Sequence, residues 1–255
     1  MNFTLTPFET LNTENIRFAD TFEGTYKTII PIEIKDDEDN VYPLIINTPP
    51  NLLTFGIQEI TDKNKENVIG YQLPICLWGK KQVSNEERLF TKKMEEIVDY
   101  IKTFLSSIKE EVNITDEMIE KINVLNWKYE NGVRCEDRGP LLYTKLLMNN
   151  KSQKILSTFI DEKTGNYIDP YDILNKKGIV TSAIKIENII IGKRITLQLK
   201  IFEVLYKKIP IRTDKKNNVR KSLLRPDIQI KRFNNKKISE PELTPNVEDE
   251  ENVMN

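Results

Sequence analysis

The segment that most constrains the fold is residues 178–206, in which two β-branched runs flank Gly192-Lys193. A glycine-containing turn between two such runs is typical of a β-hairpin. In the second run, apolar residues recur with a period of two, which predicts one buried side and one solvent-facing side. The buried side is predicted to carry Ile195, Leu197, Leu199 and Ile201, and the outer side Arg194, Gln198, Lys200 and Phe202.

The outer side of this hairpin suits a nucleic acid, because cations contact phosphates and an aromatic ring stacks on bases. The alternative is a half-solvated antiparallel strand whose outer side is basic without binding anything. On the hairpin alone the alternative is the simpler interpretation, so the decision depends on the rest of the chain.

The charge of the chain is separated along its length. The net charge is −1 over 255 residues, yet residues 193–237 hold 15 Lys and Arg against three acidic residues. Residues 240–255 hold six acidic residues and no base. Few apolar residues follow Tyr206, so we predict a basic flexible arm at 207–239 and an acidic disordered tail at 240–255.

Residue types that many enzymes require are absent. The chain has no histidine, and its two cysteines, Cys76 and Cys135, are far apart and form no CxxC pair. We therefore expect no histidine-dependent nucleophile, no zinc or thiolate site and no disulfide framework. Nucleotide-binding and serine-hydrolase motifs are also missing. The sequence predicts a non-enzymatic protein without cofactor or metal, in a reducing compartment.

No apolar run in the sequence approaches the roughly 20 residues of a membrane-spanning helix. The first residues, Met1 to Thr4, have neither the basic start nor the apolar core of a signal peptide. We expect a soluble, intracellular protein that is not secreted and has no membrane partner.

The order of the predicted elements indicates an α+β chain that is mainly antiparallel β. Ser84 and Glu87 have the spacing of a capping box, which predicts a long helix after Ser84, and a second helix is predicted at 115–124. The strands are predicted at residues 26–34, 41–46, 52–60, 70–78, 141–148, 155–160 and 178–206.

This order matches the plan of an oligonucleotide-binding-type barrel with a helix after its third strand. We assign residues 1–20 to an N-terminal arm that is loosely packed. Residues 21–206 are assigned to the barrel domain, with the pair of helices inserted at about 85–124.

Aromatic residues interleaved with cations recur along the chain, as single-strand binding requires. For each cluster the alternative is a core aromatic ring beside a solvated lysine. The basic arm has a nuclear-localisation or solubilising alternative. The candidate nucleic-acid-binding residues are Trp78, Lys80, Lys81, Trp127, Lys128, Arg138, Tyr143, Lys145, Lys185, Lys193, Arg194, Lys200, Phe202, Lys207 and Lys208.

Short phrases in the second half of the chain carry a family resemblance. They are DRGPLLYTKL at 137–146, IDP at 168–170, AIKIENIIIGK at 183–193 and ITLQLK at 195–200. The pattern resembles the single-stranded-DNA-binding-like proteins of nucleocytoplasmic large DNA viruses, over about residues 135–206. The resemblance implies an oligonucleotide-binding-type barrel that coats single-stranded DNA during replication. It supplies no residue-level binding motif.

The predicted function is therefore viral single-stranded DNA binding with little sequence preference. RNA is left open as a ligand, as is a homo-oligomer, and the acidic tail is predicted to recruit replication proteins. The expected location is the host cytoplasm or nucleus, with the virion as a further option. The alternative function is a non-enzymatic structural or scaffold protein of a virion or replication complex, whose basic arm binds an acidic partner.

Overall fold

The structure is a computed structural model that describes residues 4–79, 83–135, 137–149 and 151–209. It also describes the backbone of two short paired strands, β19 (Arg220–Lys221) and β20 (Gln229–Ile230). The chain divides into two compact units, Met1–Pro210 and Ile211–Asn255. The predicted acidic tail and most of the predicted basic arm lie outside the described residues.

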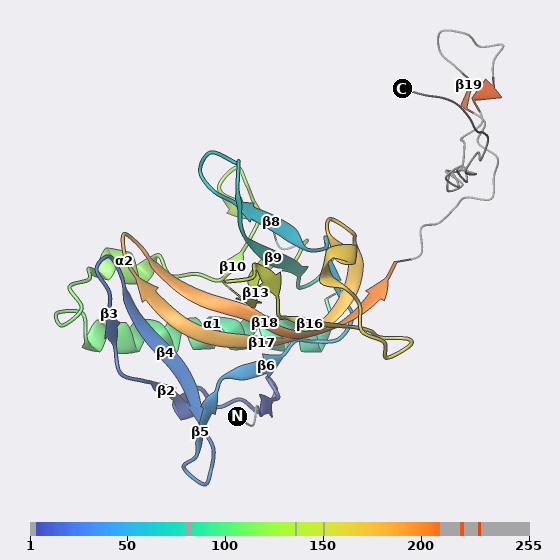
Figure 1. The fold of residues 1–255 in the computed structure, drawn as a ribbon. Coiled ribbons are helices and arrows are strands. Elements are labelled where there is room, and N and C mark those ends of the chain that lie inside the picture. The colour runs from blue at the N-terminus through green and yellow to red at the C-terminus, as the bar shows by residue number, and fades with distance from the viewer. Residues whose placement is uncertain are drawn as a thin grey trace, which may run out of the picture. The chain divides into compact units, whose positions relative to one another are not determined.

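Five strands of the first unit pair side by side to close a barrel in the described part of the chain (Figure 1). The order around the barrel is β7, β9, β13, β18, β17 and back to β7. Every pair is antiparallel except β13 with β18. This arrangement is consistent with an oligonucleotide-binding-like barrel. The bounds are β7 (Leu52–Thr54), β9 (Val68–Cys76), β13 (Leu141–Leu146), β17 (Gly178–Ile191) and β18 (Ile195–Lys208).

The long hairpin predicted at 178–206 is confirmed, because β17 and β18 pair from Gly178↔Lys208 to Ile191↔Ile195. Its alternation is confirmed as well. Ile195, Leu199 and Ile201 are buried, whereas Leu197 is half-buried. The pairing shifts register twice, with Phe202 on β18 and Glu187 on β17 as the extra residues at the two irregularities. Such β-bulges bend a strand and redirect side chains.

The outer edge of β17 extends the barrel into a larger sheet. Along its length β17 pairs in turn with β7, β6 and β4. The strand β4 alternates buried and half-buried residues and carries β2 and β3 on its other edge. Its far end pairs with β5 on the edge opposite β2, because Ile34 pairs with both strands. The bounds are β1 (Leu5–Thr6), β2 (Ile16–Phe18), β3 (Phe22–Glu23), β4 (Thr28–Lys35), β5 (Val41–Pro43) and β6 (Ile45–Asn47).

The predicted strand 52–60 is divided in two by Gly56. Its φ is +88°, and a Cβ there would lie 2.4 Å from the backbone nitrogen of Lys176, so only glycine fits. The chain therefore ends β7 at Thr54 and starts β8 (Gln58–Thr61), which pairs with β9.

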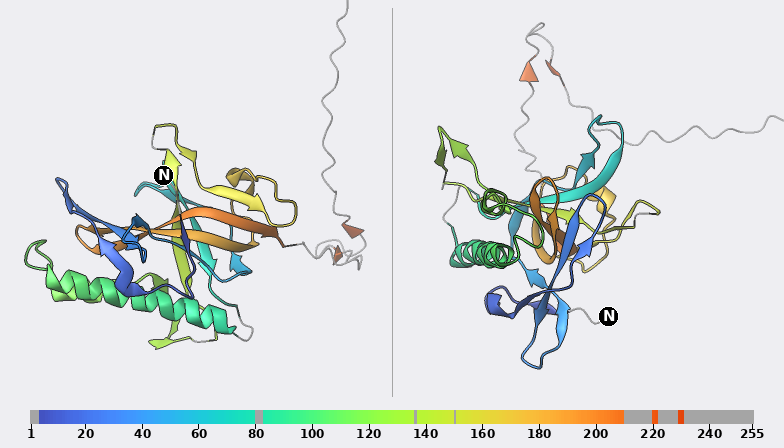
Figure 2. Two further views of the ribbon diagram at one scale, coloured as in Figure 1. Left: turned by 90° about the horizontal axis from the view of Figure 1, so that it is seen from below. Right: turned by 90° about the vertical axis from the view of Figure 1, so that its left-hand side faces the viewer.

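The helix α1 (Asn85–Ser107) begins as predicted, with the capping box of Ser84 and Glu87 in place. It runs along one side of the strands (Figure 2) and buries Phe90, Met94 and Ile101 among other residues. The second helix, α2 (Asp116–Glu120), is shorter than predicted. Both lie between the second and third barrel strands, so the expected place after the third strand is wrong. The predicted predominance of antiparallel β is confirmed, and the unit is mostly β rather than clearly α+β.

The N-terminal segment is not the loose arm that its polar composition predicts. Phe8, Leu11 and Ile16 are almost fully buried. The Phe8 ring meets the Phe90 ring of α1 edge to face, with centroids 5.3 Å apart. Scattered aromatic residues in a polar segment reach the core because β1 is fixed by parallel pairing with β6. The short 3₁₀-helix η1 (Thr13–Asn15) lies between Leu11 and Ile16 and buries none of its own residues.

The remaining elements decorate the barrel. The strand β16 pairs in parallel with the far end of β18. A small hairpin, β11 with β12, turns at Asn131-Gly132, both with positive φ, and the Asn-Gly pair is the sequence signal for such a turn. The bounds are β10 (Leu125–Asn126), β11 (Tyr129–Glu130), β12 (Val133–Arg134), β14 (Met148–Asn149), β15 (Lys154–Ile155), β16 (Thr158–Asp161) and the 3₁₀-helix η2 (Pro170–Ile173).

Candidate nucleic-acid interface

Three of the predicted lysines form a row across the outside of the barrel. Lys145 of β13 lies opposite Lys200 of β18, which lies opposite Lys185 of β17. Directly opposite residues share one face of a sheet, with Cβ atoms about 5 Å apart. Their neighbours Leu146, Ile201 and Ile184 are buried, so the lysines point outward. We call Lys145, Lys200 and Lys185 the lysine row.

A carboxylate inside the row compensates part of this charge. Glu187 lies at a bulge, and its carboxylate accepts hydrogen bonds from Lys185 Nζ at 3.0 Å and Lys200 Nζ at 2.5 Å. Its side chain is only 16% exposed. Glu187 lies two residues after Lys185, so the alternation of β17 places both side chains on the outer face, beside Lys200 of the paired strand.

The charge state of Glu187 follows from two opposing effects. Burial raises the pKa of its carboxyl. Hydrogen bonds and ion pairs with Lys200 and Lys185 lower the pKa, and together they outweigh the effect of burial. The net result is a pKa below the usual glutamate range, so Glu187 is ionised at neutral pH. It offsets one of the three positive charges of the lysine row. Lys145 is exposed and has no ion-pair partner within the described ranges.

Two predicted aromatic residues flank the row. Tyr143 lies two residues before Lys145 on the same outer face of β13 and is 41% exposed. Phe202 lies two residues after Lys200, is half-buried, and is the residue displaced by the second bulge. Gln72 of β9 lies opposite Lys145 and extends the row by an amide. The row therefore combines cations, an amide and an open aromatic ring.

The tryptophans do not belong to this surface. Trp78 is only 8% exposed and packs edge to face against Trp127 at 5.4 Å. The guanidinium of Arg134 lies 3.2 Å from the Trp127 ring centre and covers that face. Gly139 presses on Trp78 so closely that a Cβ would come within 2.5 Å. The prediction that Trp78 presents its ring to bases is corrected: its large apolar surface is used in the core.

The other predicted cations are dispersed. Lys193 and Arg194 are exposed at the β17–β18 turn, six residues or about 20 Å along β18 from the lysine row. Lys207 pairs with Glu162 at 3.1 Å at the opposite end of β18, where Lys208 also lies. Lys128 pairs with Glu130, and Arg138 lies 4.0 Å from Asp137. Lys80 and Lys81 lie outside the described residues.

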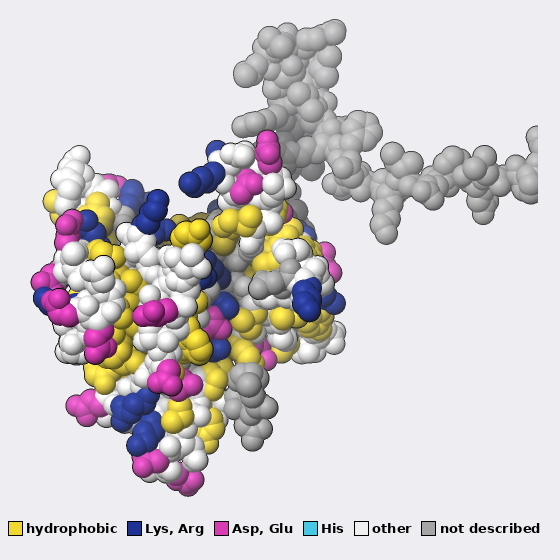
Figure 3. All heavy atoms as spheres, turned by 60° about the vertical axis from the view of Figure 1, so that its left-hand side comes forward, with side chains coloured by type: hydrophobic (Ala, Val, Ile, Leu, Met, Phe, Trp, Pro, Cys, Tyr) yellow, Lys and Arg dark blue, Asp and Glu magenta, His cyan; other side chains and the backbone are white. Residues whose placement is uncertain are grey.

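Elsewhere the surface shown in Figure 3 carries mixed charges. Figure 3 shows a face on which Lys and Arg side chains are interspersed with Asp and Glu rather than gathered in one basic surface.

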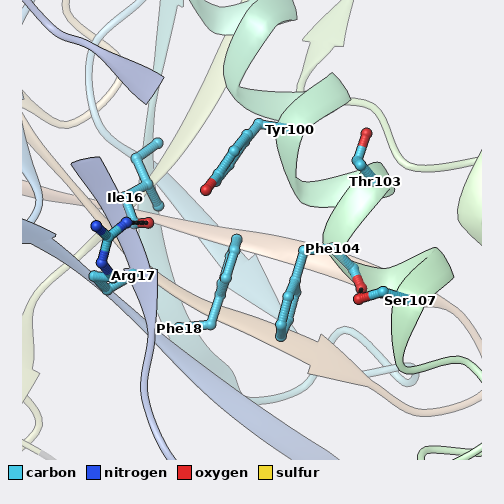
Figure 4. Close-up of a pocket in the computed structure, with 7 residues that line it drawn as sticks. All are labelled: Ile16, Arg17, Phe18, Tyr100, Thr103, Phe104 and Ser107. Carbon is cyan, nitrogen blue, oxygen red and sulfur yellow. Dashed lines mark hydrogen bonds between the residues drawn. The ribbon is translucent and has the colours of Figure 1, made fainter. Parts of the chain in front are cut away.

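A pocket of about 320 Å³ lies between β2 and α1 (Figure 4), where the rings of Phe18 and Phe104 stack at 3.7 Å. Arg17 lines this pocket but donates to the carbonyls of Glu14 and Ile16. Its guanidinium is thus already engaged.

Sequence reasoning missed Glu187 as part of the site. The signal was present, because the spacing of Ile184, Ile186 and Ile189 breaks the period of two at Glu187. A break of this kind in an otherwise alternating strand indicates a bulge.

No helix among the described residues is both long and apolar enough to cross a membrane. No group of acidic, cysteine or histidine side chains in the same part of the chain is placed to hold a metal ion. Cys76 and Cys135 are both free thiols.

Comparison with known proteins gives a family and two viral relatives. The family model described as "Protein of unknown function (DUF2738)" matches residues 22–253. Over 166 residues, 64% of this chain, the sequence is 26% identical to "Uncharacterized protein 007R" of Invertebrate iridescent virus 3 and to "Early 31 kDa protein" of Frog virus 3 (isolate Goorha). The matches span 36% and 62% of those proteins, less than two thirds of either. They confirm the predicted kinship with proteins of large DNA viruses.

Proposed function

This chain belongs to the family described as protein of unknown function (DUF2738). We propose that it binds single-stranded DNA without enzymatic activity. The DNA lies across the outer face of the barrel, over the lysine row. Binding has little sequence preference and serves viral DNA replication. The barrel is of the oligonucleotide-binding type, and the helices are an insertion between its second and third strands.

The observation that carries the proposal is the lysine row beside Tyr143. Barrels of the oligonucleotide-binding type bind their ligands on the face of the second and third strands and at the loops after the first and fourth strands. Here the second and third barrel strands carry Gln72, Tyr143 and Lys145. The loop after the fourth strand carries Lys193 and Arg194.

The chemistry of these side chains explains a sequence-tolerant interface. Lysine ammonium groups neutralise phosphates whatever the base, and every base has a face that stacks on a tyrosine. The three lysines lie side by side on neighbouring β-strands. A bound DNA strand therefore crosses β13, β18 and β17 in turn. Glu187 holds Lys185 and Lys200 in place before the ligand arrives.

The test is a binding titration by fluorescence anisotropy with labelled oligo-dT. We expect log K to fall with log salt, by about 0.7 per phosphate that is neutralised. Lys145→Ala should weaken binding at low salt and reduce this slope by less than about one unit. The matched control is Lys92→Ala, an exposed lysine on α1, which should leave both quantities unchanged.

Two results would contradict the proposal. One is an affinity that does not depend on salt, and the other is a Lys145→Ala variant that binds like Lys92→Ala. Absence of any binding to oligo-dT, together with capture of an acidic protein, would favour the scaffold function. Oligo-U of the same length, used as a competitor, distinguishes a DNA-binding from an RNA-binding protein.

A further inference from the structure

Two hairpin turns meet at one end of the sheet, beyond the barrel. The turn between β3 and β4 closes with a hydrogen bond from Gly24 N to Lys27 O at 2.9 Å. The turn between β17 and β18 lies beside it, because a Cβ on Gly192 would be 3.7 Å from the carbonyl oxygen of Tyr26. Figure 1 and Figure 2 both show the two turns at the same end of the molecule. We call this pair of turns the hairpin tip.

The hairpin tip exposes aromatic rings among cations. Tyr26 is 92% exposed and Phe22 is 62% exposed, values far above those of core aromatics. The cations around them are Lys27 from the first turn and Lys193 with Arg194 from the second, all exposed. Glu23 is the opposing charge in these two turns. Three cations against one carboxylate give this surface the sign that attracts a phosphate backbone.

A continuous outer face joins the hairpin tip to the lysine row. Phe22, Ile29, Ile190 and Thr196 are successive partners across β3, β4, β17 and β18, so their side chains share one side of the sheet. Two residues further along, Asn188 and Gln198 lie on the same side and are joined by a hydrogen bond of 3.0 Å. The lysine row follows after the Glu187 bulge.

We propose that single-stranded DNA continues from the lysine row along this outer face, and that its bases stack on Tyr26 and Phe22 at the hairpin tip. The inference rests on the proposed function and adds a second contact supplied by a hairpin outside the barrel. The two contacts are about 20 Å apart at 3.3 Å per residue. Single-stranded DNA rises about 3.4 Å per nucleotide when its bases are stacked and up to about twice that when it is extended. About three to six nucleotides therefore span the distance of about 20 Å.

The spacing makes the contact detectable by oligonucleotide length. Affinity is measured for labelled oligo-dT from about 4 to about 16 nucleotides, the range of site sizes known for such barrels. For the natural protein we expect a gain in affinity at the length at which the strand reaches the hairpin tip. The double variant Phe22→Ala, Tyr26→Ala removes two rings at about 1–3 kcal/mol each, so it should lose about 30-fold or more on long oligonucleotides and bind short ones normally.

The matched control is Tyr167→Ala. Tyr167 is 64% exposed and bridges Ile160 of β16, which pairs with the opposite end of β18. Its removal should not change affinity at any length. Thermal melts of the variants should match that of the natural protein, because Phe22 and Tyr26 are exposed.

The outcomes separate this inference from the function on which it depends. If Lys145→Ala weakens binding but the double variant binds long oligonucleotides normally, the hairpin-tip contact is refuted and the proposed function stands. If the double variant instead changes the oligomeric state in sedimentation without changing DNA affinity, the tip binds a second copy and the inference is likewise overturned. If the natural protein binds no oligo-dT, both proposals fail.

Discussion

Replacing Glu187 by glutamine tests the proposed interface because it should change stability and DNA affinity in opposite directions. Glutamine keeps the shape of the side chain but removes the negative charge that Lys185 and Lys200 share. Its amide oxygen accepts from one of them, and the other lysine loses its partner. The two lysines then become available to phosphates without first leaving a carboxylate.

The magnitudes follow from the geometry of this ion-pair cluster. The lysine side chains are 23% and 25% exposed, so water solvates part of each when the carboxylate is lost. A charge-assisted hydrogen bond contributes about 1.5–3 kcal/mol, and with this partial exposure we expect a loss of about 1–2 kcal/mol. The melting temperature should fall by about 2–8 °C for a domain of this size.

The expected gain in DNA affinity also comes from the loss of the Glu187 carboxylate. In the natural protein each phosphate competes with Glu187, and that competition disappears in the variant. We expect about tenfold tighter binding at low salt, since about 1.4 kcal/mol corresponds to that factor. Removing one carboxylate adds one net positive charge to the lysine row, which would steepen the salt slope by up to about 0.7 units.

The assays are thermal melts and oligo-dT titrations at several salt concentrations. The control is Glu203→Gln, an exposed glutamate on β18 whose removal changes the net charge equally. It should leave the melt unchanged and alter affinity much less. A Glu187→Gln variant that binds more weakly than the natural protein would refute the competition and assign Glu187 a purely positioning role.

Three further predictions concern pH, the C-terminus and the core. Because folding lowers the pKa of Glu187, its ionised carboxylate stabilises the fold fully at pH values above the usual glutamate pKa, and this stabilisation is lost as the pH falls through the lowered pKa. The melting temperatures of the natural protein and of Glu187→Gln should therefore approach each other in acid. Deleting residues 240–255 removes six negative charges and should tighten oligo-dT binding at low salt without changing the melt; weaker binding would contradict competition by the tail. Leu199→Ala should cost about 2–5 kcal/mol of stability, whereas Tyr143→Ala should melt nearly normally and lose about 1–3 kcal/mol of affinity; Phe202→Ala melting as early as Leu199→Ala would place that ring in the core.

The sequence by itself determined the local elements of this protein. The hairpin of β17 and β18, its buried side and the capped start of α1 all follow from the period of the apolar residues and from one capping box. These signals are local, since the pleat and the helix turn relate residues only a few positions apart. The family resemblance at residues 135–206 likewise identified viral kinship from short phrases alone.

The tertiary structure decided which of these elements meet. Lys145 lies 40 or more residues from Lys185 and Lys200, and only the parallel pairing of β13 with β18 makes them neighbours. Trp78 and Phe8 carry no local mark that separates a core ring from an exposed one, and both are buried. Strand pairing and burial depend on contacts distant in sequence, and a single bulge at Glu187 shifts the alternation of the residues that follow it, so that Asn188 faces outward and Ile189 inward.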